Sequence, residues 1–219
     1  MKERKNLDSE IENSSAPIME HLVELRTRII HSLIAFLITM SISFYFADDV
    51  FNFLSLPIIS LLNSYGQNTE LIYTGLQQGF MVHIKISIFA GFLFAFPFIS
   101  FQLWRFVAPG MYKNEKKAFL PFLISSPLLF ILGAAFAFYV VMPLAFDFLL
   151  KFQQNQGDGM VELLKIKYLG SINEYLSLTM AFIIAFGLSF QLPVLLTLLG
   201  KVGLVTSAGL ASFRKYAAV

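Results

Sequence analysis

Cysteine is absent from this chain of 219 residues, and charged side chains make up only 14% of it. The absence of cysteine excludes disulfides, thiolate metal ligands and cysteine nucleophiles. The net charge of +2 is too small to indicate a nucleic-acid partner. The sequence also lacks a G-x-x-x-x-G-K-[ST] loop, a G-x-S-x-G elbow and an H-E-x-x-H helix. We therefore expect neither an enzyme nor a bound metal or cofactor.

Hydrophobic side chains dominate instead, at 57% of the residues including 25 Phe, with a mean hydropathy of +0.70. This composition predicts an integral membrane protein. Four apolar stretches approach or exceed the roughly 20 residues that cross a bilayer as a helix, and they lie at about residues 29–46, 84–104, 118–146 and 175–200. Their length and lack of alternation favour helices over strands. We predict an all-α polytopic transmembrane helix bundle that forms a single domain over residues 1–219.

The basic residues between these stretches predict the orientation of the bundle. Twelve of the 16 Lys and Arg side chains lie in the N-terminal segment, in the connection between the second and third spans, or in the tail after the fourth span. Lys and Arg accumulate on the cytoplasmic side of membrane proteins. We therefore expect residues 1–28, the second connection and residues 201–219 to be cytoplasmic.

Proline occurs within the apolar stretches, at Pro97, Pro121, Pro127 and Pro193. Each proline removes a backbone hydrogen bond and favours a kink. In the first outer connection, residues 50–62 are apolar but too few to span the bilayer, and Pro57 interrupts them. We expect a short helix in the outer membrane interface there.

The three histidines do not predict a haem site. In the expected orientation, His31 lies near the cytoplasmic end of the first span and His83 at the outer entrance of the second. A hydrocarbon core of about 30 Å separates these depths, so the two cannot bind one iron. His21 precedes the first span altogether.

A charged decapeptide at residues 19–28 runs directly into the first span. On a helix, His21, Glu24 and Arg28 share one face. Glu24 and Arg28 are four residues apart, so a plain surface ion pair is one interpretation. A second acid, Glu115, lies in the next cytoplasmic connection, beside three lysines. The alternative interpretation is that the two acids bind a cationic ligand on the cytoplasmic face.

Several runs in this sequence resemble those of the TatC family, the receptor subunits of the twin-arginine protein translocase. The resemblance covers residues 18–219, with the runs in the family's order. The runs are HLVELRTR at 21–28, QLWRFVAPGMYKNEKK at 102–117, FAFY at 136–139, PLAF at 143–146, MAF at 180–182 and FGLSFQLP at 186–193.

The resemblance implies a glove-like bundle of six spans in the bacterial inner membrane. It implies a receptor that binds the paired-arginine signal peptides of folded precursor proteins, for export driven by the proton-motive force. The implied partners are the single-span subunits TatA and TatB, further copies of the chain within the same complex, and the lipid bilayer.

The same resemblance assigns roles to particular residues of this sequence. Glu24 and Glu115 match the family's acids that recognise the arginine pair, and a guanidinium fork suits a carboxylate better than the point charge of lysine does. Leu22, Arg26 and Phe106 match supporting positions of that region. Pro57 matches a family proline in the first outer loop.

Two features depart from the family pattern. Gln191 stands where many members have a glutamate in the fourth span, which weakens any proton-linked role because an amide needs hydrogen bonds but no counter-charge. The sequence ends at Val219, so we expect residues 201–219 to lead into a fifth span in the complete protein. Without the resemblance, a receptor, a membrane solute carrier and a redox-complex membrane anchor all remain open.

Overall fold

The computed structural model describes residues 2–66, 69–107, 116–157 and 170–201. This part of the chain is helical apart from its connections and one isolated bridge, between Ile72 and Ser171. The helical elements are α1 (Lys2–Tyr45), α2 (Ala47–Ser64), α3 (Gln78–Val107), α4 (Lys116–Phe136), η2 (Ala137–Val141), α5 (Met142–Gly157), α6 (Ile172–Ser189) and α7 (Leu192–Lys201).

Four helical segments are long and apolar enough to cross a membrane, as the sequence predicts. They are His21–Tyr45, Gln78–Phe106, Leu123–Lys151 and Ile172–Thr197. Helix α1 passes without a break from the charged decapeptide into the first of them. The third comprises α4, η2 and α5 in one rod, and the fourth comprises α6 and α7.

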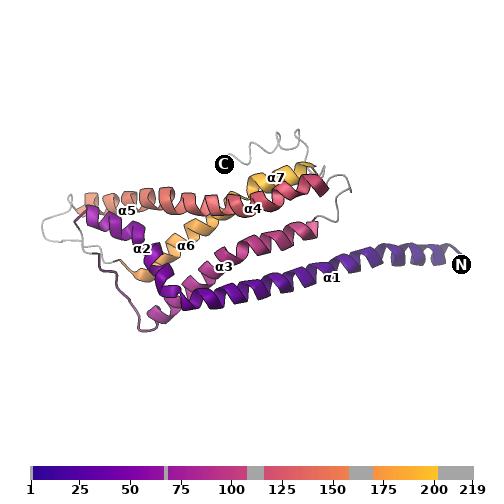
Figure 1. The fold of residues 1–219 in the computed structure, drawn as a ribbon, viewed down its shortest axis with the longest axis horizontal. Helices are drawn as coiled ribbons and strands as arrows, with labels where there is room; N and C mark the ends of the chain where they lie inside the picture. The colour runs from indigo at the N-terminus through magenta and orange to yellow at the C-terminus, as the bar shows by residue number, and fades with distance from the viewer. Residues whose placement is uncertain (1, 67–68, 108–115, 158–169, 202–219) are drawn as a thin grey trace.

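The helices form two arms, one of α1 with α3 and one of the α4–η2–α5 rod with α6 and α7 (Figure 1). In the first arm, α1 lies along α3. A Cβ atom on Gly91 of α3 would come within 2.6 Å of the Met40 Cα on α1. The Thr39 hydroxyl donates a hydrogen bond to the Gly91 carbonyl over 2.8 Å. The absence of a side chain at Gly91 thus brings the two helix backbones together.

The second arm is built from α4, η2, α5, α6 and α7. A Cβ atom on Gly133 of α4 would lie 2.6 Å from the Phe186 carbonyl oxygen of α6, so this crossing is also close. The α-helical hydrogen bonding widens to a π-helix at η2, where Ala137 and Phe138 are buried. Helix α6 ends at Ser189, and α7 restarts at Leu192 with Pro193 in its first turn. Proline suits this position because the first helical amides have no partner within the helix.

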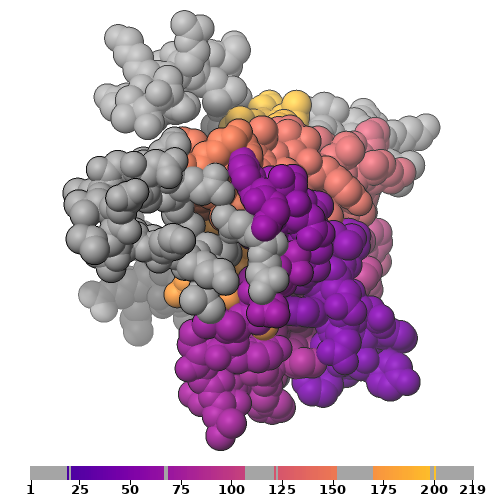
Figure 2. Space-filling model, turned by 90° about the vertical axis from the view of Figure 1, so that its left-hand side faces the viewer, coloured from indigo at the N-terminus to yellow at the C-terminus, as the bar shows by residue number. Residues whose placement is uncertain are grey.

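Helix α2 confirms that the segment around Pro57 is helical and shows that the helix continues through the proline. It is one helix of 18 residues that contains Pro57. One face of α2 is buried, and its residues Leu54, Ile58 and Leu62 belong to the main hydrophobic core. The spacing of these residues by four is that of a single helical stripe. Helix α2 is therefore a strut that joins the first arm to α5, as Figures 1 and 2 show.

Polar contacts tie together the end of the bundle at which α2 lies, here called the α2 end. Tyr65 donates a hydrogen bond to Asp147 over 2.5 Å, which connects the residue after α2 to α5. The Lys85 ammonium donates to Asn173 over 2.6 Å and joins α3 to α6. The Tyr175 hydroxyl donates to the Leu54 carbonyl over 2.5 Å. These contacts hold the arms together at the α2 end, and the opposite end is here called the Glu24 end.

Candidate functional site

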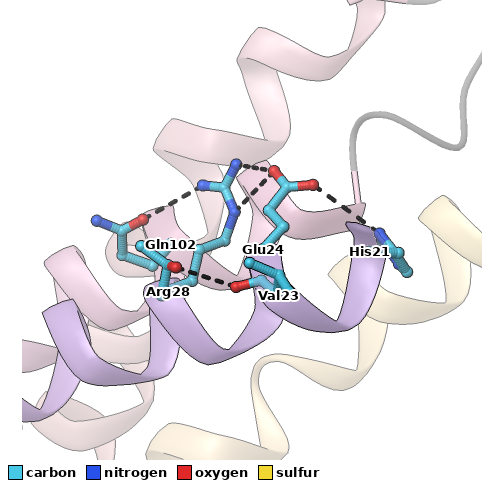
Figure 3. A network of polar contacts seen from close by, with 6 residues as sticks. His21, Val23, Glu24, Arg28 and Gln102 are labelled. Atoms are coloured by element: carbon cyan, nitrogen blue, oxygen red, sulfur yellow. Dashed lines mark hydrogen bonds and ion pairs between the residues drawn. The ribbon is translucent and has the colours of Figure 1, made fainter. Parts of the chain in front are cut away.

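The Glu24 carboxylate holds the guanidinium group of Arg28, one helical turn further along α1 (Figure 3). Arg28 donates twice to the Glu24 Oε1 atom, from Nε over 3.1 Å and from Nη2. The other side of the carboxylate faces His21, whose Nδ1 lies 3.9 Å from Oε2. The interpretation as an ion pair within the helix is therefore confirmed.

Arg28 also connects this ion pair to α3. Its Nη1 atom donates to the Gln102 side-chain oxygen over 3.3 Å. The Arg28 side chain is only 15% exposed, whereas that of Glu24 is 34% exposed. The guanidinium is therefore fixed between α1 and α3, and the carboxylate is the part that a ligand can reach.

A second contact between α1 and α3 lies beside the first. The His21 imidazole stacks on the Phe106 ring, with the ring centroids 4.2 Å apart and the planes 14° from parallel. Gln102 and Phe106 are four residues apart on α3, so both project from one face of that helix. The two contacts hold Glu24 at the seam between α1 and α3, between a stacked ring pair and a bound guanidinium.

Leu22 and Arg26 do not join this cluster. Both are exposed, and each is two residues from Glu24, which places it about 200° around α1. In the structure, His21 connects Phe106 to Glu24. Leu22 and Arg26 lie on another side of the helix. Glu115, the second predicted acid, lies outside the described residues.

Gln191 lies in a separate polar network inside the bundle. Its amide nitrogen donates to the Ser126 carbonyl over 2.9 Å, and the Ser126 hydroxyl donates to its oxygen over 2.6 Å. The Ser126 hydroxyl also contacts that of Ser100 over 2.7 Å. Every hydrogen bond in this network is between neutral groups, so the amide is held without a counter-charge. Pro57 is half-buried within α2.

The described part of the chain contains no group of three His, Cys, Asp or Glu side chains arranged to hold a metal ion. His83 contacts Asp48 over 2.8 Å near the α2 end, far along α3 from Phe106 and its partner His21.

The contact of Gln102 with Arg28 was not predicted from the sequence. This residue belongs to the run at 102–117 that carries the family resemblance. Its contact with Arg28 joins residues 74 positions apart in the chain, and no local pattern reveals such a pair. Only the packing of α1 along α3 brings them together.

Comparison with known protein families matches residues 20–219 to the family described as Sec-independent protein translocase protein (TatC). Three relatives carry the name Sec-independent protein translocase protein TatC. The protein from Magnetococcus marinus is 43% identical over 96% of this chain and 72% of its own length. The protein from Aquifex aeolicus is 47% identical over 91% of this chain and 79% of its own. The Escherichia coli K12 protein is 36% identical over 93% of this chain and 74% of its own length.

The fold also resembles solved structures. A crystal structure of the twin-arginine translocase receptor TatC matches with a TM-score of 0.75 and 47% sequence identity, over 90% of this chain and 81% of that one. A second, of the same receptor in DDM, matches with a TM-score of 0.76 and 46% identity, over 90% and 82%.

Proposed function

The chain belongs to the TatC family of Sec-independent protein translocase proteins, and from this we propose that its Glu24 end receives the paired-arginine signal peptides of folded precursor proteins. As a family member it is a multi-pass inner-membrane protein and a component of the Tat translocase. The observation that carries the proposal is the Glu24 carboxylate, which is exposed at the seam of α1 and α3 and binds a guanidinium of its own chain.

The Glu24–Arg28 contact supports recognition of arginine in particular. Arg28 donates from two nitrogen atoms to the carboxylate, a geometry that the planar guanidinium fork allows and a lysine ammonium does not. An arginine of the signal peptide takes the place of Arg28 on Glu24. Arg28 keeps its contact with Gln102 while it yields the carboxylate.

This exchange explains why two arginines are needed. Replacing one guanidinium by another conserves the number of contacts to Glu24, so the first arginine gains little free energy. A second arginine supplies the net gain if it meets a second carboxylate. Glu115, eight residues beyond the end of α3 at Val107, is the acid that we assign to it. Pairing with a partly shielded carboxylate favours binding by about 1.5–3 kcal/mol.

The remaining predicted residues take supporting roles in this proposal. The stacked rings of His21 and Phe106 form a flat wall beside the carboxylate, against which the peptide backbone packs. Leu22 and Arg26 are exposed on another side of α1, and we assign them to the part of the peptide, or of a partner, that passes around the helix. We assign the lysines beside Glu115 to lipid phosphates, which long basic side chains can reach from the membrane surface.

Orientation and partners complete the proposal. The excess of Lys and Arg at the Glu24 end supports a cytoplasmic N-terminus, which is the side from which precursors arrive. We assign TatA and TatB as single-span partners, further copies of the chain as neighbours, and the proton-motive force as the energy source, on the basis of family membership.

Pro57 and Gln191 have structural roles in this proposal. Pro57 belongs to the strut α2, and Gln191 anchors α4 to the α6–α7 junction as a neutral group.

Binding of a signal peptide to the chain in membrane vesicles tests the site. We expect a paired-arginine peptide that carries a photoreactive group to crosslink to the wild-type chain. The isosteric variant Glu115→Gln should weaken binding by about tenfold, as expected for loss of one charge-assisted hydrogen bond. Glu24→Gln should weaken binding by a smaller factor, because Arg28 already pairs with that carboxylate in the free chain. Replacing the arginine pair of the peptide by lysines should have a similar effect.

Glu174→Gln provides the matched control. Glu174 is an exposed acid in the first turn of α6, at the α2 end, so its loss changes the net charge equally without touching the site. Undiminished crosslinking of the Glu24→Gln variant, or equal binding of the arginine and lysine peptides, would refute the assignment of Glu24.

A further inference from the structure

A hollow opens between α2, α3, and the rod of α4 and η2. It encloses about 620 Å³ and is lined by apolar side chains that include Phe53, Phe89, Leu93, Phe130 and Phe138. None of these residues belongs to the Glu24 cluster.

A second, smaller hollow adjoins it. It encloses about 350 Å³ and is lined by residues of α1, α2 and α3 that include Thr39 and Phe46. Val50 and Phe94 line both hollows. The Phe94 side chain is 70% exposed and forms the ridge between them. A single ligand with two apolar chains can therefore place one chain on each side of Phe94.

The size of the larger hollow suits a small ligand better than a whole partner helix. A helix of about 20 residues with side chains is a cylinder roughly 10–12 Å wide and 30 Å long, with a volume on the order of 2,500 Å³. The hollow of about 620 Å³ holds only a fraction of such a helix. It falls within the range of about 300–1,000 Å³ that is typical of small-molecule sites.

The length of the larger hollow suits the acyl chain of one leaflet. Its lining on α3 extends from Phe89 to Pro97. The rise along α3 between these two residues is roughly 12 Å at about 1.5 Å per residue. One leaflet contributes about half of the 30 Å hydrocarbon core.

The mouth of the larger hollow carries a negative charge. Asp49, in the first turn of α2, is the one charged side chain among the described residues that line it. The neighbouring Asp48 contacts the His83 imidazole. Asp49 is exposed and has no polar partner among the described residues. A carboxylate at this depth repels anionic lipid headgroups and attracts an ammonium group that donates hydrogen bonds.

We infer that this pair of hollows binds one phospholipid with a primary-amine headgroup, whose ammonium group contacts Asp49 and whose acyl chains lie on either side of Phe94. The site depends neither on the proposed receptor function nor on the orientation of the chain, because it needs only a bilayer leaflet at the α2 end.

Native mass spectrometry of the purified chain in detergent tests this site. Phosphatidylethanolamine, phosphatidylcholine and phosphatidylglycerol with identical acyl chains are added in separate titrations. We expect one phosphatidylethanolamine to be retained at a concentration about fivefold to tenfold lower than phosphatidylglycerol, with phosphatidylcholine between them because its ammonium group has no N–H donor.

Two pairs of variants separate the headgroup contact from the apolar hollow. Asp49→Asn should abolish the preference for phosphatidylethanolamine, whereas Glu70→Gln, an exposed acid outside the lining, should retain it. Ala134→Trp fills the larger hollow and should end retention of all three lipids, whereas Leu132→Trp, on an exposed position outside the lining, should not.

Equal retention of phosphatidylethanolamine and phosphatidylglycerol by the wild-type chain would overturn the proposal. So would an unchanged preference in Asp49→Asn, whose exposed side chain makes a folding defect an inadequate explanation. Retention of no lipid by the wild-type chain would show that the hollows serve another occupant.

Discussion

Arg28 stands in the place that the proposed function gives to an arginine of the signal peptide. It donates to Glu24 from two nitrogen atoms and is itself held by Gln102. A guanidinium of the same chain thus competes with the ligand for one carboxylate. Such a competitor lowers the affinity for every cation by the same factor, and an arginine compensates better than a lysine because only its fork reproduces the two contacts that it displaces.

Removing this competitor should tighten binding. We expect Arg28→Gln to raise the affinity for a paired-arginine peptide by up to about fivefold, the equivalent of one exposed ion pair, and to raise the affinity for a paired-lysine peptide by a similar factor, because both peptides displace the same contact. Fluorescence anisotropy with the two labelled peptides measures both changes.

Arg105→Gln is the control for the change in net charge. Arg105 is exposed on α3 and makes no hydrogen bond to Glu24, so its loss alters the local charge without freeing the carboxylate. If Arg28→Gln weakened binding of the arginine peptide, Arg28 would be part of the binding surface and the exchange would be wrong.

At this scale the sequence predicted the acid and its pairing but not its surroundings. The spacing of Glu24 and Arg28 by four residues is a local property of a helix, so their contact could be weighed from the sequence alone. Gln102 and Phe106 reach the same place from α3. Their contribution depends on how two spans align along their length, and hydropathy does not determine that alignment.

Among the elements, the spans were the most predictable part of the molecule. Hydropathy alone located all four membrane-length helices because a backbone in lipid must satisfy its own hydrogen bonds. The kink expected from Pro193 corresponds to the break between α6 and α7. The π-helix at Ala137–Val141 was not predicted, since the inserted residue follows from packing against neighbours and has no signature in the sequence.

The fit between α1 and α3 depends on Gly91. We expect Gly91→Ala to lower the stability of the chain by about 1–3 kcal/mol, because the added methyl group meets the backbone of Met40 at 2.6 Å and a helix backbone cannot move aside alone. The change is measured as the thermal unfolding midpoint in detergent.

Gly79→Ala is the matched control on the same helix. A Cβ atom on Gly79 would have no neighbour closer than 3.9 Å, so the substitution should be neutral, or should stabilise α3 by up to about 1 kcal/mol through helix propensity. Equal effects of the two substitutions would show that the α1–α3 crossing tolerates a side chain at residue 91. The close approach of Gly91 to Met40 would then contribute little to the stability of the chain.

At the scale of the whole molecule, α2 joins the two arms at the α2 end, and contacts between α3 and α4, such as Ser100 to Ser126 over 2.7 Å, join them nearer the Glu24 end (Figure 1). Helix α2 is the strut between them, because it packs on α3 on one side and on α5 on the other. The sequence predicted that a helix exists here but not that it bridges the arms. Its burial follows from Leu54, Ile58 and Leu62, whose single stripe also suits a helix lying on a membrane surface.

The contact between Tyr65 and Asp147 fixes the far end of this strut to α5. We expect Tyr65→Phe to lower the thermal midpoint by about 2–4 °C and to broaden the distance distribution between the Glu24 ends of the arms. Because the chain has no cysteine, spin labels at Leu103→Cys on α3 and Leu196→Cys on α7, both exposed, report this distance by double electron–electron resonance.

Lys151→Gln is the control, because it removes the ion pair of Asp147 within α5 and keeps the hydrogen bond from Tyr65 to Asp147. It should leave the distance distribution narrow.

The pH dependence gives an independent check. The hydrogen bond to Asp147 raises the pKa of the Tyr65 phenol, so the contribution of this contact is complete below about pH 10, the ordinary value for tyrosine, and is lost as the pH rises through the raised value. The wild-type distribution should therefore broaden only above about pH 10, and that of Tyr65→Phe should not change further there. A distribution that is equally narrow in wild type and Tyr65→Phe would mean that the apolar face of α2 alone sets the angle between the arms.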